Sequence, residues 1–296
     1  MNAEAEGRLA AERFRREHGL GTQPLGDLVA IIEQATRIDV AVLNVGPDEH
    51  GLTMRDPLRG TVFVGVARTR NPMRQRSTLA HELGHVLFED WTPNNDSHWS
   101  ERKPTEIRAD AFARHLLVPL GGLRELLQSR EPREPREPRT TLTQADLSSV
   151  VQRFLVSPAI AAIALSQAKY LDDATKSEWM SVSASQLAGR FGWSDQYHAL
   201  QADSDRQRAP QRLLARAISG YAEGVLSAQT IATLRGIPLA IAEAELREAG
   251  VEPSAHPIAW TDSTDLPDAR VDLEELDNDL NLPGNDRCTL TERDAQ

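Results

Sequence analysis

Two histidines four residues apart, in the run His81-Glu82-Leu83-Gly84-His85, constrain this chain more than any other feature. On an α-helix, residues at this spacing lie about 40° apart around the axis, so both imidazole rings can reach one metal ion. Glu82 lies on the neighbouring flank, where it can reach a water bound to that ion without ligating it. The run therefore predicts a helix that holds a metal and a base on one face.

The residues around this run have the pattern of a single helix. Asn71 and Pro72 provide an N-cap and a first-turn proline, and no further proline occurs from Met73 to Phe88. Gly84 costs such a helix about 1 kcal/mol relative to alanine, which fits a place where another backbone passes close to the metal. An apolar stripe accompanies the histidines and consists of Leu79, Ala80, Leu83, Val86 and Leu87.

A hydrolytic zinc site uses three protein ligands and keeps one position open, so a third ligand must come from outside the motif. A closely following third histidine is excluded, because Phe88 and Trp91 occupy the corresponding positions. Glu106 follows His85 by 21 residues (106 − 85 = 21) and opens a second helical pattern. We predict Glu106 as the third ligand. The alternative carboxylates are Glu89, Asp90 and Glu101.

Asp110 lies one turn after Glu106 on the same helical face. We expect it to accept the outer N–H of a ligand histidine, with His81 as the partner, which would fix the tautomer of that ring. A pair with Arg108 or Arg114 is the alternative for this carboxylate.

Two further histidines are weighed for this site. His98 lies in a polar segment from Thr92 to Lys103 and is a candidate oxyanion stabiliser, with an ordinary loop histidine as the alternative. His115 lies about 180° around the second helix from Glu106, so we expect it to be a packing or surface residue.

The chemistry of such a site is hydrolysis. Zinc lowers the pKa of a bound water to about 7 and polarises a carbonyl. Glu82 would take the proton of that water and pass it to the leaving amine. The residues therefore predict a peptidase with Zn²⁺ as its cofactor.

Two runs of the chain carry a resemblance to a known family. The first is Ser77-Thr78-Leu79-Ala80-His81-Glu82-Leu83-Gly84-His85-Val86-Leu87, and the second is Glu106-x-x-Ala109-Asp110-x-Phe112-Ala113-x-x-Leu116-Leu117-Val118-Pro119. Together they resemble the ImmA/IrrE family of metallo-endopeptidases, a gluzincin-like HExxH type, with Asp110 in place of Asn and Val118 in place of Met. The similarity covers roughly residues 25–170.

This resemblance implies a cytoplasmic protease with a narrow substrate. The implied substrate is a helix-turn-helix repressor of the XRE type, whose site-specific cleavage derepresses genes of a mobile element or a stress response. Other members act in toxin–antitoxin-like pairs. A DNA-binding or antitoxin-like regulatory protein with a non-catalytic metal site is the alternative function.

The period of the apolar residues predicts an α+β, mainly helical fold. Helices are expected at Ala3–His18 and Leu25–Thr36, followed by a small antiparallel sheet packed on the catalytic helix. Its strands are expected at Ile38–Leu43, His50–Asp56 and Thr61–Ala67, with a turn at Asp56–Gly60 between the last two. We take Thr61–Val66 as the edge strand to which an extended substrate could add. A sheet that only packs on the helix is the alternative.

Composition shifts divide the chain into five predicted segments. They are a metallopeptidase domain (1–128), an Arg-Glu-Pro spacer (129–141), a helix-turn-helix-like unit (142–175), a C-terminal helical domain (176–252) and an acidic tail with the composition of disorder (253–296). Proline at every third residue favours an extended spacer. Within the C-terminal domain, Trp193 and the charged run Asp203–Arg208 suggest a surface connection.

Two stretches have the outline of helix-turn-helix units, Thr143–Tyr170 and Ser227–Ala249, yet their charges argue against direct DNA binding. A recognition helix needs Lys or Arg for phosphates and base edges. Ala159–Tyr170 has only Lys169, whereas Leu239–Ala249 has three glutamates against Arg247. We expect packing or protein-binding modules.

Charge and cysteine usage point to a cytosolic protein. The net charge of −11 argues against broad nucleic-acid binding. The single cysteine, Cys288, cannot form a disulfide within one chain, which fits a reducing compartment. The acidic start of the chain is unlike a signal peptide, and no apolar run approaches the ~20 residues of a membrane span. We therefore expect a cytoplasmic location.

Overall fold

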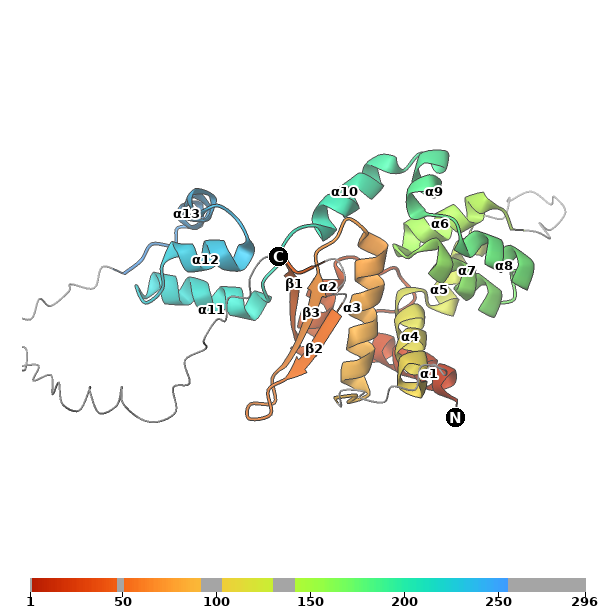
Figure 1. Cartoon of the computed structure of the whole chain (residues 1–296), viewed down its shortest axis with the longest axis horizontal. Helices are drawn as coiled ribbons and strands as arrows, with labels where there is room; N and C mark the ends of the chain where they lie inside the picture. Colours follow the sequence, from red (N-terminus) through yellow and green to blue (C-terminus); the bar gives the residue numbers. More distant parts are fainter. Residues whose placement is uncertain (1, 47–50, 92–102, 130–141, 255–296) are drawn as a thin grey trace, which may run out of the picture. The chain divides into compact units, whose positions relative to one another are not determined.

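The structure is a computed structural model that describes residues 2–46, 51–91, 103–129 and 142–254. His98, Cys288, residues 130–141 of the spacer and residues 255–296 of the tail lie outside the described residues. Helices dominate and a single three-stranded sheet accompanies them within this described part, so the α+β, mainly helical fold is confirmed (Figure 1).

The sheet consists of β1 (Asp39–Leu43), β2 (Gly51–Arg55) and β3 (Val62–Ala67), in the order β1-β3-β2. β2 and β3 are antiparallel, and the predicted turn between them is closed by Gly60 N–H donating to Asp56 O at 2.8 Å. β1 and β3 are parallel, so the sheet is mixed and the prediction of a wholly antiparallel sheet was wrong. The hairpin returns β3 alongside β1, where the apolar side chains of both strands enter one core.

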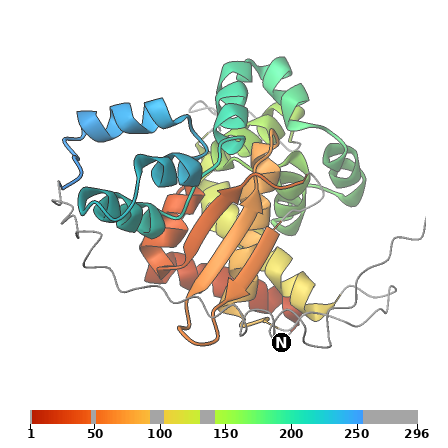
Figure 2. The same cartoon turned by 60° about the vertical axis from the view of Figure 1, so that its left-hand side comes forward.

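The strand order also corrects the predicted edge. Thr61–Val66 falls on β3, which is the central strand, so it cannot accept an added strand. β1 is bridged on its outer side by Arg208, through two backbone hydrogen bonds with Val42 of 2.9 and 3.0 Å. β2 is the edge strand that has no further strand partner among the described residues, and its side chains are largely exposed. Figure 2 shows the sheet with β2 at its margin.

The first helices of the chain are α1 (Ala3–Glu17), α2 (Leu28–Thr36), α3 (Pro72–Leu87), α4 (Pro104–Leu117) and α5 (Leu120–Gln128). Among them, α2 and α3 contact this sheet. α3 packs on β2 and β3, and α4 packs on α3 and α1 (Figure 1).

Two glycines allow these helices to approach one another closely. A Cβ at Gly84 would lie 3.2 Å from the Cα of Ala109, so the backbone that passes Gly84 is that of α4. A Cβ at Gly7 of α1 would lie only 2.2 Å from Arg108 O. Larger residues at these positions would push α4 away from its neighbours.

Five helices follow: α6 (Gln144–Phe154), α7 (Pro158–Gln167), α8 (Asp173–Met180), α9 (Ala184–Phe191) and α10 (Ser194–Ser204). α6 ends at Leu155 in the left-handed region, and Ser157 caps α7 by accepting from Ile160 N–H at 3.2 Å. One hydrophobic core runs from Ala11 to Tyr197 and therefore includes both helices.

The length and apolarity needed to cross a membrane are not found in any single described helix. α6 and α7 reach them only as a pair, and the pair is bent by 108°.

Trp193 corrects another expectation. Its side chain is 5% exposed, it donates from Nε1 to Ser148 Oγ at 2.9 Å, and it packs edge-on against Tyr197. The segment around it is thus part of the core, and the predicted surface connection at Trp193 was wrong. Pattern reasoning missed this because the hydrogen-bond acceptor of the ring, Ser148, lies in α6, 45 residues earlier.

The last described helices form a small cluster with its own core. They are α11 (Gln211–Ala222), α12 (Ala228–Arg235) and α13 (Leu239–Glu248). Ala217, Ala228, Ile231 and Leu246 are the buried residues of this second core. The bounds of α6, α7, α12 and α13 match the two predicted helix-turn-helix outlines.

Candidate metal centre

Local sequence places both helices of the centre. Asn71 caps α3 by accepting from Arg74 N–H at 3.3 Å, and Pro72 occupies the first turn. Pro104 starts α4 in the same way and leaves Glu106 in its first turn. The close contact at Gly84 then brings the first turn of α4 next to the last turns of α3.

The structure brings His81, His85 and Glu106 together. The Nε2 atoms of the two histidines lie 2.9 Å apart. Glu106 Oε2 lies 3.3 Å from His81 Nε2, and Glu106 Oε1 lies 3.5 Å from His85 Nε2. One ligand atom from each residue lies within 4.8 Å of the other two, so the three can hold a metal ion.

The opposite ring nitrogens are held by carboxylates. His81 Nδ1 lies 2.8 Å from Asp110 Oδ1, which is the partner expected from the sequence. His85 Nδ1 lies 3.3 Å from Asp90 Oδ2. When each Nδ1–H donates to its carboxylate, the lone pair of each Nε2 faces Glu106 and is available to a cation.

Asp90 is a site residue that sequence reasoning weighed only as an alternative metal ligand. Glu89 adopts φ = 56°, which turns the chain back so that Asp90 N–H donates to His85 O at 3.0 Å. The other oxygen of Asp90 contacts the guanidinium of Arg108, which lies over the ring of Phe88 at 4.6 Å. The signal available in the sequence was a carboxylate three residues after Leu87, the last residue of α3, but the turn that orients it was not visible.

Glu82 points toward β2 and not toward the ring nitrogens. Its Oε2 accepts a hydrogen bond from Thr53 Oγ1 at 2.6 Å. A Cβ at Gly51 would lie 2.6 Å from Glu82 Oε1, so the first residue of β2 closes over this carboxylate. Thr53 was also missed from the sequence, because its contact depends on the packing of β2 against α3.

The electrostatics of the centre favour cations. Burial lowers the pKa of His81, but the hydrogen bond to Asp110 and the charges of Asp110, Glu106 and Glu82 outweigh it, so the pKa is raised above its ordinary value. A metal ion at the Nε2 atoms would meet the same surrounding negative charge.

The donor set fits zinc. Two imidazole nitrogens and one carboxylate oxygen form the kind of three-ligand set found in catalytic zinc sites, which keep a fourth position open. No fourth His, Cys, Asp or Glu joins the group within the part of the chain that the structure describes. The arrangement is therefore suited to Lewis-acid chemistry beside the carboxylate of Glu82.

The remaining candidates lie elsewhere. His115 is buried on the α1 side of α4, 3.7 Å from Glu4 Oε1, in agreement with its expected packing role. Burial and the nearby charge of Arg114 lower the pKa of His115 to about 4. Glu89 is exposed, and His98 and Glu101 fall outside the described residues.

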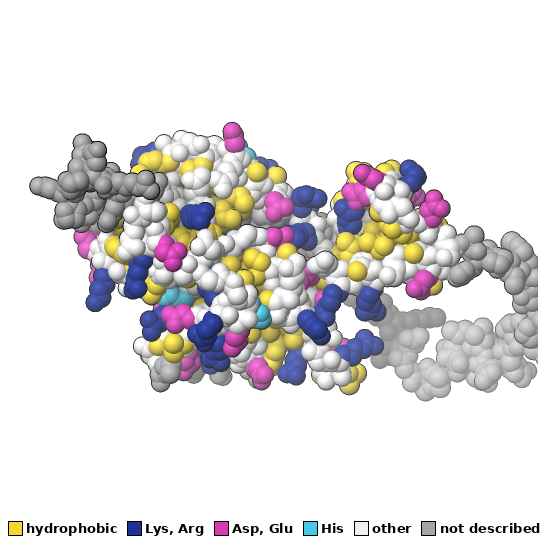
Figure 3. Space-filling model, turned by 180° about the vertical axis from the view of Figure 1, so that it is seen from behind, with side chains coloured by type: hydrophobic (Ala, Val, Ile, Leu, Met, Phe, Trp, Pro, Cys, Tyr) yellow, Lys and Arg dark blue, Asp and Glu magenta, His cyan; other side chains and the backbone are white. Residues whose placement is uncertain are grey.

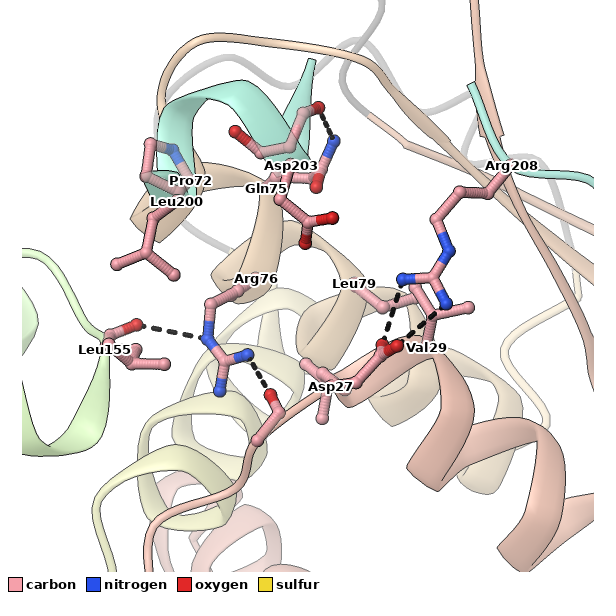
Figure 4. A pocket seen from close by; sticks show the side chains of 13 residues that line it. Asp27, Val29, Pro72, Gln75, Arg76, Leu79, Leu155, Leu200, Asp203 and Arg208 are labelled. Atoms are coloured by element: carbon pink, nitrogen blue, oxygen red, sulfur yellow. Dashed lines mark hydrogen bonds and ion pairs between the residues drawn. The ribbon is translucent and has the colours of Figure 1, made fainter. Parts of the chain in front are cut away.

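A separate pocket of about 190 Å³ lies among α2, α3 and α10 and contains none of the metal-centre residues (Figure 4). Its two arginines are already engaged. Arg76 donates to the carbonyls of Leu155, Gly26 and Leu25 at 3.2, 2.6 and 2.7 Å, and Arg208 forms a bidentate pair with Asp27. The bonds of Arg76 tie the N-terminal half of α3 to the chain before α2 and to the end of α6, whereas the pair of Arg208 with Asp27 does not involve α3.

Comparison with known proteins gives one positive result. The model of the IrrE N-terminal-like domain, peptidase family M78, matches residues 36–166, a range that includes α3, α4 and all of α7 except Gln167. The chain has no match among curated proteins.

Proposed function

We propose that this chain is a zinc-dependent endopeptidase of the ImmA/IrrE type in which Glu82 is the general base, because residues 36–166 match the IrrE N-terminal-like domain of peptidase family M78. The observation that carries the proposal is the convergence of His81, His85 and Glu106 within 4.8 Å, from two helices, with the Glu82 carboxylate next to His81 in the chain and held by Thr53.

Each residue has a defined task in this proposal. A bound zinc ion supplies positive charge that polarises a peptide carbonyl and acidifies water. His81, His85 and Glu106 hold the ion, while Asp110 and Asp90 keep both imidazoles in the binding tautomer. Glu82, oriented by Thr53, takes a proton from the attacking water and returns it to the leaving nitrogen.

The exposed edge of β2 supports an extended peptide as the substrate. A peptide that pairs with β2 through main-chain hydrogen bonds would pass over Thr53. It would thereby come close to Glu82, which is bound to Thr53. From the family resemblance, we propose that this peptide belongs to a cytoplasmic helix-turn-helix repressor of the XRE type. Its cleavage would derepress genes of a mobile element or a stress response.

The test is cleavage of a candidate repressor encoded beside this protein, with zinc present or removed by a chelator. The wild-type chain should cut at one site only with metal. Glu82→Gln should retain zinc and lose cleavage by a factor of about 10²–10⁴. Glu12→Gln is the matched control, because Glu12 is an exposed glutamate of α1 outside the metal centre and should leave cleavage unchanged. Retained cleavage by Glu82→Gln would refute the base assignment.

A further inference from the structure

A pocket of about 420 Å³ opens directly beside the metal centre. Its walls come from three helices: His81 and Glu82 of α3, Ala113 of α4, and Ile160 and Ile163 of α7. The pocket shares His81, Glu82 and Asp110 with the centre, and it reaches toward a helix that begins at Pro158.

The α7 wall of this pocket is apolar throughout. From Pro158 to Leu165, α7 has only proline, alanine, isoleucine and leucine. Ala161, Ala162, Ala164 and Leu165 are buried, whereas Ile160 and Ile163 remain partly exposed at the pocket. A charged group seated against this wall would lose its hydration without gaining a partner.

The charged groups of the pocket already have partners. Arg114 Nη2 contacts Glu4 Oε1 at 2.5 Å, and Arg114 Nε donates to Gln167 at 3.2 Å. Glu82 accepts from Thr53, and Asp110 lies 2.8 Å from His81. The two carboxylates also make the pocket unfavourable for an acidic side chain.

We propose that this pocket receives a large apolar side chain, such as Leu, Ile, Met or Phe, from the substrate residue next to the scissile bond. The proposal rests on the proposed peptidase function and adds a specificity to it. Ile160 and Ile163 are the specificity-determining residues, because they alone bring α7 side chains to the pocket among the residues described.

The test uses the full-length zinc-loaded protein and a random-sequence peptide library, with cleavage sites read by mass spectrometry. The wild type should favour large apolar residues on one side of the cut by about 10- to 100-fold in kcat/KM over acidic residues and alanine. Ile160→Trp fills the pocket and should shift the preference to Gly, Ala and Ser. Ile163→Ala enlarges it and should shift the preference toward Phe and Trp.

Ile31→Ala is the matched control, because Ile31 is a partly buried isoleucine of α2 outside the pocket. It should leave the cleavage preference unchanged, and thermal melting checks that each variant is folded. A second measurement avoids catalysis: a peptide hydroxamate with an isobutyl side chain should raise the melting temperature of the zinc-loaded wild type more than one with a carboxymethyl side chain. Ile160→Trp should abolish that difference.

The outcomes separate the two proposals. Cleavage without an apolar preference, or a preference that both folded pocket variants leave unchanged, would overturn the pocket assignment and leave the peptidase intact. Equal melting shifts from the two hydroxamates would overturn the assignment in the same way. No cleavage and no hydroxamate binding by the zinc-loaded wild type would overturn the peptidase proposal itself, and the pocket assignment with it.

Discussion

The two helix pairs α6–α7 and α12–α13 share one sequence outline, but they differ in what they pack against and in how much of the second helix is buried. Both pairs turn at a left-handed residue, Leu155 or Gly236, and restart at a proline two or three residues later. α7 is enclosed in the main core and lines the pocket beside His81. α13 instead leaves Leu239 and Ile241 exposed and packs in the small second core with α11 and α12. Figure 3 shows hydrophobic side chains at the surface of this last part of the chain, at the right of the view.

The difference shows what a helix-turn-helix pattern specifies. It sets where two helices begin and end, because caps, prolines and left-handed residues act locally. It does not set what the second helix contacts, which depends on its charge. α7 has no charged residue, so every face can be buried, whereas α13 has Glu243, Glu245, Arg247 and Glu248 and keeps most of its surface in water.

The largest difference between the pairs should be in stability. Phe154→Ala at the end of α6 removes a ring that is 2% exposed, and it should lower the free energy of unfolding by about 3–5 kcal/mol. Ile241→Ala on α13, where the side chain is 47% exposed, should change it by less than about 0.5 kcal/mol. Urea denaturation of both variants measures this contrast, and equal effects would show that the pairs are packed alike.

Metal affinity should depend on the neighbourhood of α3 and not on acidic residues elsewhere. Asp90→Ala leaves the outer nitrogen of His85 without its carboxylate, so zinc affinity should fall about 10- to 100-fold. Asp195→Ala, an exposed carboxylate in the first turn of α10, is the control and should leave it unchanged. Competition with a chromophoric chelator gives both values. An unaltered affinity in Asp90→Ala would remove the positioning role of this residue.

Acid should lower the stability of the region around His115 before it lowers that of the α11–α13 cluster. His115 has a folded pKa of about 4 against an ordinary value of 6.5, so the unfolded chain binds more protons between these values and stability falls as pH drops through that window. Between pH 7 and pH 5 the loss should be about 2 kcal/mol. Residues 211–251, by contrast, contain no histidine. Denaturation of the metal-free wild type and His115→Gln at both pH values tests this, and identical pH dependence would contradict it.

The smallest effect should come from the ion pair that connects the segment after α10 to α2. Arg208 and Asp27 are both partly exposed, so water screens their attraction. Arg208→Gln should cost no more than about 1 kcal/mol of stability. It should also leave zinc affinity unchanged, because the pair lies in the pocket away from the metal centre. A large loss of zinc binding would mean that this pair controls the position of α3.

Prediction from sequence succeeded where the determinants were local and failed where they were distant. The bounds of α3, the approach of Asp110 to His81 and the turn at Gly60 follow from caps, spacing and glycine. The parallel pairing of β1 with β3, the burial of Trp193 and the hydrogen bond from Thr53 to Glu82 depend on partners tens of residues away. Asp90 is an intermediate case, because its orientation depends on the left-handed conformation of a single neighbouring residue, Glu89.

Zinc binding by Glu106→Ala, compared with the wild type, tests the central claim most directly. The wild type should bind one zinc ion per chain, and the variant should lose at least about 100-fold in affinity, because only His81 and His85 would remain as ligands. If the variant binds zinc as tightly as the wild type, the ion is not held between α3 and α4, and the account of this chain as a metallopeptidase fails.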